Sequence, residues 1–157
     1  MAKPDGIQAV CVRDGSSGDW DPALETGMEQ IDRQHQALFG QLRALLDCLK
    51  SGRIRETFKF MVDSAVEHFK TEEDLHQATG YPRADEHSAS HSRFVVNLRT
   101  LEREFADREH GLANLAQTAE FLLAWLKKHI QQRDRDFADY FHPLHRRHEF
   151  IECGLRG

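Results

Sequence analysis

From Trp20 onward, apolar residues recur along the chain at intervals of three and four, which is the period of an α-helix with one buried face. The pattern predicts a first helix from about Glu29 to Lys50, ended by Ser51 and Gly52. His35 takes one place in the otherwise apolar stripe of this helix. The other members of the stripe are Ile31, Leu38, Leu42, Leu45 and Leu49. A histidine therefore lies on a face that we expect to be buried.

Three more helices follow the same period. The second is expected from about Ile54 to Thr79, where the sequence GYP (80–82) ends it, because glycine suits a helix C-cap and proline cannot continue a helix. The third is expected from about Ala84 to Asp107, and the fourth begins near Leu112. A last segment, Phe137 to about Cys153, either extends the fourth helix or forms a short fifth one, with Pro143 as the expected interruption.

Short connections between long helices favour antiparallel neighbours. We therefore expect an all-α fold, an up-down-up-down antiparallel four-helix bundle over residues 20–141. Residues 1–19 are polar and rich in glycine and serine, and we expect them to form a flexible N-terminal extension. Residues 142–157 are expected to form a short, helical C-terminal tail. No part of the sequence alternates between apolar and polar residues as a β-strand would.

The composition excludes several classes of function. The formal net charge is −5 at pH 7 and no segment concentrates basic residues, so we do not expect a nucleic-acid binder. No segment has the length and apolar character of a membrane span or a signal peptide, so we expect a cytoplasmic protein. The cysteines, Cys11, Cys48 and Cys153, form no C-x-x-C pair, which argues against a thiolate zinc site and for a reducing compartment.

Seven side chains of metal-binding types fall on the inward faces of the four helices. They are His35, His68, Glu72, His87, His91, His129 and Asp134. His68 and Glu72 are one helical turn apart, as are His87 and His91. Such a pair is offset by only about 40° around the helix, so both members face one target.

A single inward histidine is ordinarily a hydrogen-bonded core or surface residue. Seven inward ligand types on four helices instead indicate a metal, because unpaired charge and unsatisfied imidazole are costly to bury. Imidazole and carboxylate without thiolate favour iron, manganese or zinc. Five imidazoles and two carboxylates suit a pair of iron ions.

The spacing of His129 and Asp134 leaves two interpretations open. Five residues along an ideal α-helix rotate the second side chain by about 140° away from the first. Both reach one site only if the helix unwinds there or takes a π-type turn, a distortion common at functional sites. Alternatively, Asp134 is an ordinary exposed acid within the sequence QQRDRD.

The same residues carry a family resemblance. The chain resembles the hemerythrins, and most closely the bacterial ones, in Trp20 and in the stretches TGMEQIDRQH (26–35), HFKTEE (68–73), TGYPRADEHSASH (79–91) and WLKKHIQQRD (125–134). The resemblance covers about residues 20–140, and the ligand motifs H, H-x-x-x-E, H-x-x-x-H and H-x-x-x-x-D occur in the family's order. It implies a non-haem diiron site that binds O2 reversibly.

Carried over residue by residue, the resemblance implies that His87, His91 and His129 hold one iron in a filled coordination shell. It implies that His35 and His68 hold the other iron, which keeps an open position for O2. Each of these histidines has the place in the motif order that the family assigns to its counterpart.

The resemblance also makes Asp134 a ligand, and it implies that Glu72 and Asp134 bridge the two irons together with an oxo or hydroxo group. The apolar wall that keeps water and outside protons from the oxidised pair would correspond to Leu38, Phe69, Trp125, Leu126 and Ile130. A role in core packing is compatible with that assignment.

One position departs from the family. His76 stands one turn past Glu72, where the family usually has methionine or another apolar residue. Two interpretations stay open: an exposed histidine or a partner of a ligand, and an added ligand or proton donor near the open iron. Glu73 and His76 also form an E-x-x-H of ferritin type, but that fold needs a second such motif, which is missing.

The tail histidines His142, His145 and His148 have a spacing of three, which could indicate a second metal site but is ordinarily a surface feature. The leading interpretation of the chain is an O2-binding protein for storage, delivery or scavenging. The alternatives are a sensor of O2, nitric oxide or redox state that acts through an unidentified protein partner, and a diiron peroxidase or oxidase. His76 is the feature that would favour the enzyme.

Overall fold

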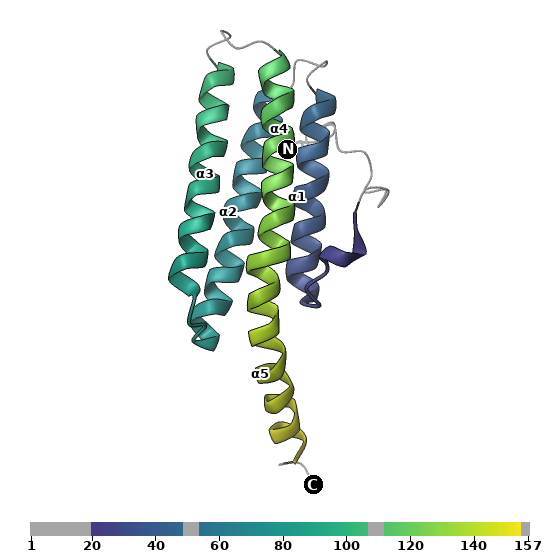
Figure 1. Ribbon diagram of the computed structural model, residues 1–157, viewed down its shortest axis with the longest axis vertical. Helices are drawn as coiled ribbons and strands as arrows, with labels where there is room; N and C mark the ends of the chain where they lie inside the picture. The colour runs from purple at the N-terminus through teal and green to yellow at the C-terminus, as the bar shows by residue number, and fades with distance from the viewer. Residues whose placement is uncertain (1–19, 49–53, 107–111, 155–157) are drawn as a thin grey trace, which may run out of the picture.

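The computed structural model describes residues 20–48, 54–106 and 112–154, and the side chains of 20–44, 57–103 and 116–146 (Figure 1). Its elements are the 3-10 turn η1 (Pro22–Leu24), the α-helices α1 (Glu29–Cys48), α2 (Ile54–Thr79), α3 (Ala84–Ala106) and α4 (Leu112–His129), the π-helical turn η2 (Ile130–Asp134), and α5 (Arg135–Gly154). Four long helices form the antiparallel bundle that the sequence predicts, and the described residues include no strand. The expected ends at Lys50 and Asp107 lie outside the described residues.

Asp32 fixes the entry into α1. Its Oδ1 accepts hydrogen bonds from the backbone N–H and the hydroxyl of Thr26, both at 2.8 Å, and its Oδ2 accepts one from the N–H of Gly27 at 2.9 Å. Gly27 has a φ of +81°, a conformation that side chains rarely adopt. Because Asp32 lies one turn before His35, this loop also sets the register of the histidine.

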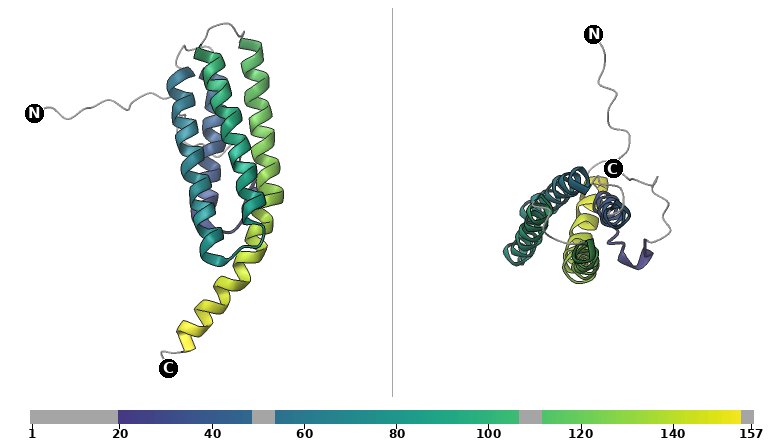
Figure 2. Two further views of the ribbon diagram at one scale, coloured as in Figure 1. Left: turned by 90° about the vertical axis from the view of Figure 1, so that its left-hand side faces the viewer. Right: turned by 90° about the horizontal axis from the view of Figure 1, so that it is seen from above.

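Helix α2 packs between α3 and α1, and α1 in turn packs against α4, which lies in front in Figure 1. Figure 2 shows the same bundle from the side and from above. The backbones of α3 and α4 approach each other less closely, and aromatic rings fill the space between them. Phe94 of α3 stacks on Trp125 of α4 with ring centroids 4.3 Å apart. These large rings separate α3 from α4, and the wider spacing gives room for a site among the four helices.

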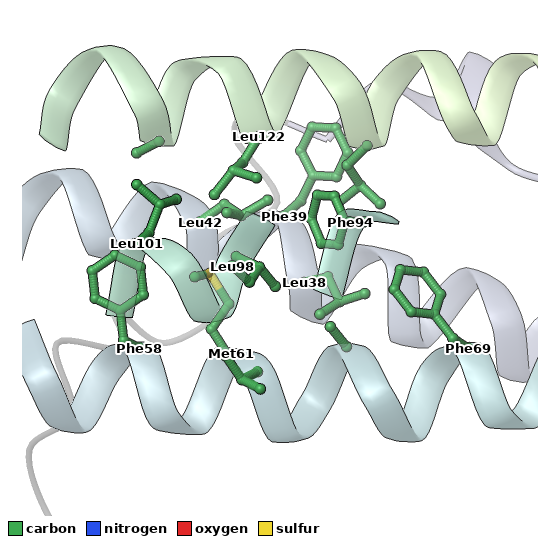
Figure 3. Packing of buried hydrophobic residues seen from close by; sticks show 14 of the residues in the cluster. Leu38, Phe39, Leu42, Phe58, Met61, Phe69, Phe94, Leu98, Leu101 and Leu122 are labelled. Atoms are coloured by element: carbon green, nitrogen blue, oxygen red, sulfur yellow. The ribbon is translucent and has the colours of Figure 1, made fainter. Parts of the chain in front are cut away.

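Two apolar clusters lie along the bundle. The large apolar cluster extends from Phe58 and Leu101 to Phe69, Phe94 and the turn after α4 (Figure 3). The small apolar cluster lies near the α2–α3 connection and consists of Met28, Ile31, Tyr81, Phe137 and Ala138. Each fully buried leucine or phenylalanine stabilises the fold by about 1.5–3 kcal/mol. The candidate ligands come from the stretch of the bundle between these clusters.

Helix α5 continues from α4 through η2 and extends beyond the ends of the other helices (Figures 1 and 2). The expected interruption at Pro143 is wrong, because α5 passes through this residue. Proline lacks the N–H that would bond to the carbonyl of Asp139. Both residues are exposed, so water can serve that carbonyl and the helix continues.

Side chains at the start of α5 tie it to the two nearest connections. Arg135 donates to the carbonyl of Ala23 at 2.9 Å, and the hydroxyl of Tyr140 donates to the carbonyl of Thr79 at 2.8 Å. Asp136 pairs with Arg83 and accepts a hydrogen bond from the hydroxyl of Tyr81. These contacts fix the helix that follows Asp134.

Among the side chains that the structure describes, the tail histidines belong to no group of three or more potential metal ligands. His142 Nε2 donates to the carbonyl of Thr26 at 2.8 Å, whereas His145 is exposed and lies against the ring of Phe141. The side chain of His148 lies outside the described residues. His142 therefore helps to hold α5 against the loop before α1. Among the described residues, no helix is both long and apolar enough to cross a membrane.

Candidate metal centre

The structure brings all seven predicted ligand residues together in the interior of the bundle. None of them exposes more than 4 % of its surface. Their ligand atoms form two groups, each with all atoms within 4.8 Å of one another. The larger ligand set is Glu72, His87, His91, His129 and Asp134, and the smaller ligand set is His35, His68 and Glu72. Glu72 belongs to both.

The larger ligand set converges through three imidazole Nε2 atoms. His129 Nε2 lies 2.9 Å from His87 Nε2 and 3.1 Å from His91 Nε2. Asp134 Oδ1 lies 3.0 Å from His87 Nε2 and 3.1 Å from His129 Nε2. Lone pairs this close repel one another unless a proton or a cation lies between them.

The turn η2 is what allows His129 and Asp134 to share this site. The segment Ile130–Asp134 is π-helical, which is the local distortion that the spacing of five requires. Asp134 is fully buried, so the interpretation of it as an ordinary exposed acid is wrong. The wider turn brings the carboxylate back to the face that His129 occupies.

The two carboxylates lie between the ligand sets. Asp134 directs Oδ1 toward His87 and His129, and its Oδ2 lies 3.1 Å from His35 Nε2. Glu72 Oε2 lies 3.1 Å from His91 Nε2, and its Oε1 lies 3.8 Å from His35 Nε2. Glu72 Oε2 also lies 3.8 Å from His68 Nε2, so each carboxylate lies against imidazoles of both sets.

The buried polar atoms lack hydrogen-bond partners. Both oxygens of Glu72 and of Asp134, both ring nitrogens of His35 and Nε2 of His68 make no hydrogen bond. Leaving a buried polar group unsatisfied costs about 1–3 kcal/mol, and more for a charge. So many unsatisfied donors and acceptors in one place fit a bound cation, and a nitrogen and oxygen set without thiolate suits non-haem iron.

Burial favours the neutral form of the His68 and His91 imidazoles. It lowers the pKa of His68 to about 3, with help from the neighbouring His35. Burial, followed by repulsion from His87 and His129, lowers the pKa of His91. Neutral imidazole is the form that binds a metal, so these residues are ready to act as ligands near pH 7.

The surroundings shift the pKa values of the two carboxylates in opposite directions. Burial and the negative charges of Asp134 and Glu73 raise the pKa of Glu72 well above its usual value. Burial also opposes ionisation of Asp134, but the imidazoles of His129, His35 and His87 outweigh it and hold the pKa well below normal. Two buried carboxylates this close need a cation before both can be ionised.

Three polar residues that the sequence analysis did not identify support the ligand rings. Gln34 Oε1 accepts from His68 Nδ1 at 3.1 Å, and Glu73 Oε1 accepts from His91 Nδ1 at 3.0 Å. Ser90 Oγ lies 3.3 Å from His129 Nδ1. Gln34, Glu73 and Ser90 each adjoin a ligand in the sequence, which is the one signal that could have found them.

The residues expected to form the apolar wall surround the same place. Phe69 stacks on His91 with centroids 4.0 Å apart, and Trp125 stacks on His129 at 4.6 Å. Leu38, Leu126 and Ile130 are buried in the large apolar cluster. Apolar and aromatic side chains thus cover the site toward the middle of the bundle.

His76 is buried, so the interpretation of it as an exposed residue is wrong. Its ring lies 4.6 Å from the ring of His87, 4.3 Å from Phe137 and 5.0 Å from Tyr81, between centroids. Burial lowers its pKa to about 4, and neither ring nitrogen has a hydrogen-bond partner. His76 thus accompanies the larger ligand set. Glu73, its partner in the E-x-x-H motif, bonds to His91 instead.

Comparison with known proteins agrees with this geometry. Residues 26–141 match the family described as the hemerythrin HHE cation binding domain. The chain is 25 % identical over 127 residues to a bacteriohemerythrin of Clostridium acetobutylicum, which covers 76 % of this chain and 98 % of that protein. It is 32 % identical over 114 residues to a bacteriohemerythrin of Methylococcus capsulatus, an alignment that covers 70 % of this chain and 85 % of that protein. It is 27 % identical over 115 residues to a myohemerythrin of Riftia pachyptila, which covers 73 % of this chain and 86 % of that protein. A match over most of the four-helix bundle, including all seven converging residues, places this chain in the hemerythrin family.

Proposed function

We propose that this protein binds O2 reversibly at a pair of iron ions held by the seven buried ligands, and serves in oxygen storage, delivery or scavenging. The shared carboxylates support two ions, because Glu72 and Asp134 each lie against imidazoles of both ligand sets. Membership of the hemerythrin family supports the same ligand chemistry.

The observation that carries the proposal is the inequality of the two ligand sets. The larger set has three imidazoles, whereas the smaller set has the two of His35 and His68, and both carboxylates lie against imidazoles of each set. Side chains of the larger set would occupy nearly all the coordination positions of an iron bound there. The smaller set would leave an iron with room for a small external molecule, and a pair of ferrous ions held by these residues would supply the reversible electron transfer that O2 binding needs.

The chain's own residues serve this role by holding the ligands and excluding water. Leu38 lies one turn after His35 and is buried, and Phe69 directly follows His68. Apolar side chains beside the smaller set offer no proton and no hydrogen bond to a bound molecule. An O2 molecule bound there is then more readily released unchanged than reduced.

The test is reduction of the iron-loaded protein without air, followed by exposure to air and then removal of O2, watched by visible absorption. The proposal expects about two irons per chain and a visible band that appears with O2 and disappears without it. Two zinc ions and no iron, in protein from cells with adequate iron, would overturn it.

A sensor is the second candidate, and one observation favours it. Asp134 ends η2 and is followed at once by α5, which extends past the bundle. A change at the metal pair would reach α5 through a single peptide bond. A change in the protection of α5 from hydrogen exchange on adding O2 would support a sensor. Equal protection with and without O2 would favour the O2 carrier.

A further inference from the structure

The two ligand sets are supported by polar bridges of the same shape. On one side, Gln34 of α1 reaches two residues of α2: its Oε1 accepts from His68 Nδ1 at 3.1 Å, and its Nε2 donates to Thr71 Oγ1 at 3.2 Å. On the other side, Glu73 of α2 reaches two residues of α3. Its Oε1 accepts from His91 Nδ1 at 3.0 Å and from Ser88 Oγ at 2.8 Å. In both bridges the two residues reached are three apart.

The hydrogen bonds fix the direction of each bridge. The hydroxyl of Thr71 donates to the carbonyl of Glu67 at 2.9 Å, so it accepts from the amide of Gln34, whose oxygen is then the one facing His68. His91 turns Nε2 toward Glu72 Oε2 at 3.1 Å, which leaves Nδ1 to carry the proton toward Glu73. Both rings therefore present Nε2 to the interior of the site.

The two bridges differ in charge. Gln34 is a neutral amide, whereas Glu73 is a carboxylate whose side chain is 35 % exposed. A carboxylate that accepts the distant N–H of a metal-bound imidazole raises the basicity of that ligand and tunes the metal. A more basic ligand stabilises a ferric ion more than a ferrous one. Partial exposure moderates the effect, because water screens the charge.

We propose that Glu73 is a positioning residue that acts through His91 to make the iron of the larger ligand set the first of the pair to be oxidised. The inference rests on the proposed function for the presence of two irons. The iron next to His35 and His68, supported only by the amide of Gln34, is then the second to lose an electron. The chain thus assigns different reduction potentials to the two halves of one site.

The experiment exchanges the two bridging groups. Glu73→Gln keeps an acceptor for His91 Nδ1–H but removes the charge, and Gln34→Glu adds a charge beside His68. The two one-electron steps of the iron-loaded protein are measured by potentiometric titration, with visible absorption and electron paramagnetic resonance as readouts. Asp74→Asn is the matched control, because it removes one negative charge from the adjacent position of α2, where Asp74 pairs with Lys70 on the surface.

The expected result differs between the variants. Glu73→Gln raises the midpoint of the first oxidation step, and a tenfold loss of ferric preference corresponds to about 59 mV for one electron. Gln34→Glu lowers the midpoint of the second step. Asp74→Asn moves neither. Unchanged midpoints in Glu73→Gln, or a shift as large in Asp74→Asn, would overturn the inference.

A second readout does not need iron. In metal-free protein, nitrogen NMR of the imidazoles should show His91 protonated at Nδ1, a tautomer that Glu73→Gln keeps and Glu73→Ala loses. Iron binding should weaken by about 10- to 100-fold in Glu73→Ala and recover in Glu73→Gln. His91 protonated at Nε2 in the wild type would overturn the inference alone. A wild type that binds no iron overturns the proposed function as well.

Discussion

The larger and smaller ligand sets lie in one bundle but are built differently. In the larger set, His91 and His129 are each covered by an aromatic ring, and a carboxylate supports His91. In the smaller set, His35 and His68 meet edge to face at 4.6 Å, and the support is an amide. The larger set resembles a site made to retain its ion, and the smaller set one made to leave part of its ion accessible.

The comparison also shows why neither set is independent. Glu72 and Asp134 come from different helices and face both sets, so loss of either removes a ligand from each side.

Removal of a shared carboxylate should have the largest effect. Glu72→Ala takes one oxygen ligand from each set and leaves the imidazoles without a counter-charge, so iron content should fall from about two to one or fewer per chain. Metal analysis of purified protein measures this. Glu67→Ala, an exposed carboxylate on the same helix, is the control and should keep both irons. Two irons retained in Glu72→Ala would mean that Glu72 bridges nothing.

Acid should destabilise the metal-free protein in a defined range. Burial lowers the pKa of His68 to about 3 and of His76 to about 4, and also lowers those of His87 and His91. Well above pH 6.5 these four histidines are neutral in both the folded and the unfolded chain, so their burial costs no stability there. As pH falls from about 6.5 to 4, the unfolded chain takes up protons that the folded chain refuses, and the free energy of unfolding decreases.

Each such histidine contributes a slope of up to about 1.4 kcal/mol per pH unit in that range. Urea unfolding of metal-free protein at several pH values measures the slope. Bound iron should raise the free energy of unfolding but not flatten this slope, because iron keeps the ligands of the folded chain free of protons while the unfolded chain still takes them up. A free energy of unfolding that stays constant between pH 6.5 and 4 would contradict the buried neutral imidazoles.

The sequence predicts the helices and the ligand positions well because both depend on the helical period. His68 with Glu72, and His87 with His91, share a face by spacing alone, and no tertiary contact is needed to infer it. Asp134 needs the π turn, which spacing requires but cannot locate. Its buried position is therefore a finding of the structure.

Other features depend on contacts between distant residues, which no local pattern contains. Pro143 stays helical because α5 is tied to Thr79 and Thr26 through Tyr140 and His142. The sequence left open whether His76 is exposed or lies near a ligand, and the small apolar cluster in fact encloses it through Tyr81 and Phe137.

A change beside the smaller set should affect the lifetime of the oxygenated form. Leu38→Ala opens a space one turn after His35 through which water can approach, so the visible band formed in air should decay faster. Leu98→Ala is the matched control, a fully buried leucine of the same cluster almost two turns beyond His91. Both variants should lose about 2–5 kcal/mol of stability. Equal decay in wild type and Leu38→Ala would remove Leu38 from the pocket wall.

A change beside the larger set should have the smallest effect. His76→Met replaces a buried imidazole that has no hydrogen-bond partner, so the metal-free protein should gain on the order of 1 kcal/mol in unfolding free energy. The decay of the oxygenated form should match that of the wild type from pH 6 to 8, because the ring lies against His87 of the larger set. A longer-lived band in His76→Met would instead make His76 a proton donor or competing ligand.

Reversible absorption together with iron content is the decisive observation for this protein. The reduced, iron-loaded chain is exposed to air, returned to an O2-free atmosphere, and taken through the cycle again while the visible spectrum is recorded. If the two unequal ligand sets hold two irons and shelter one open position, we expect about two irons per chain. We also expect a visible band that returns with similar intensity in successive cycles. A protein with two irons that shows no such band, or loses it permanently after one exposure, would contradict reversible O2 binding.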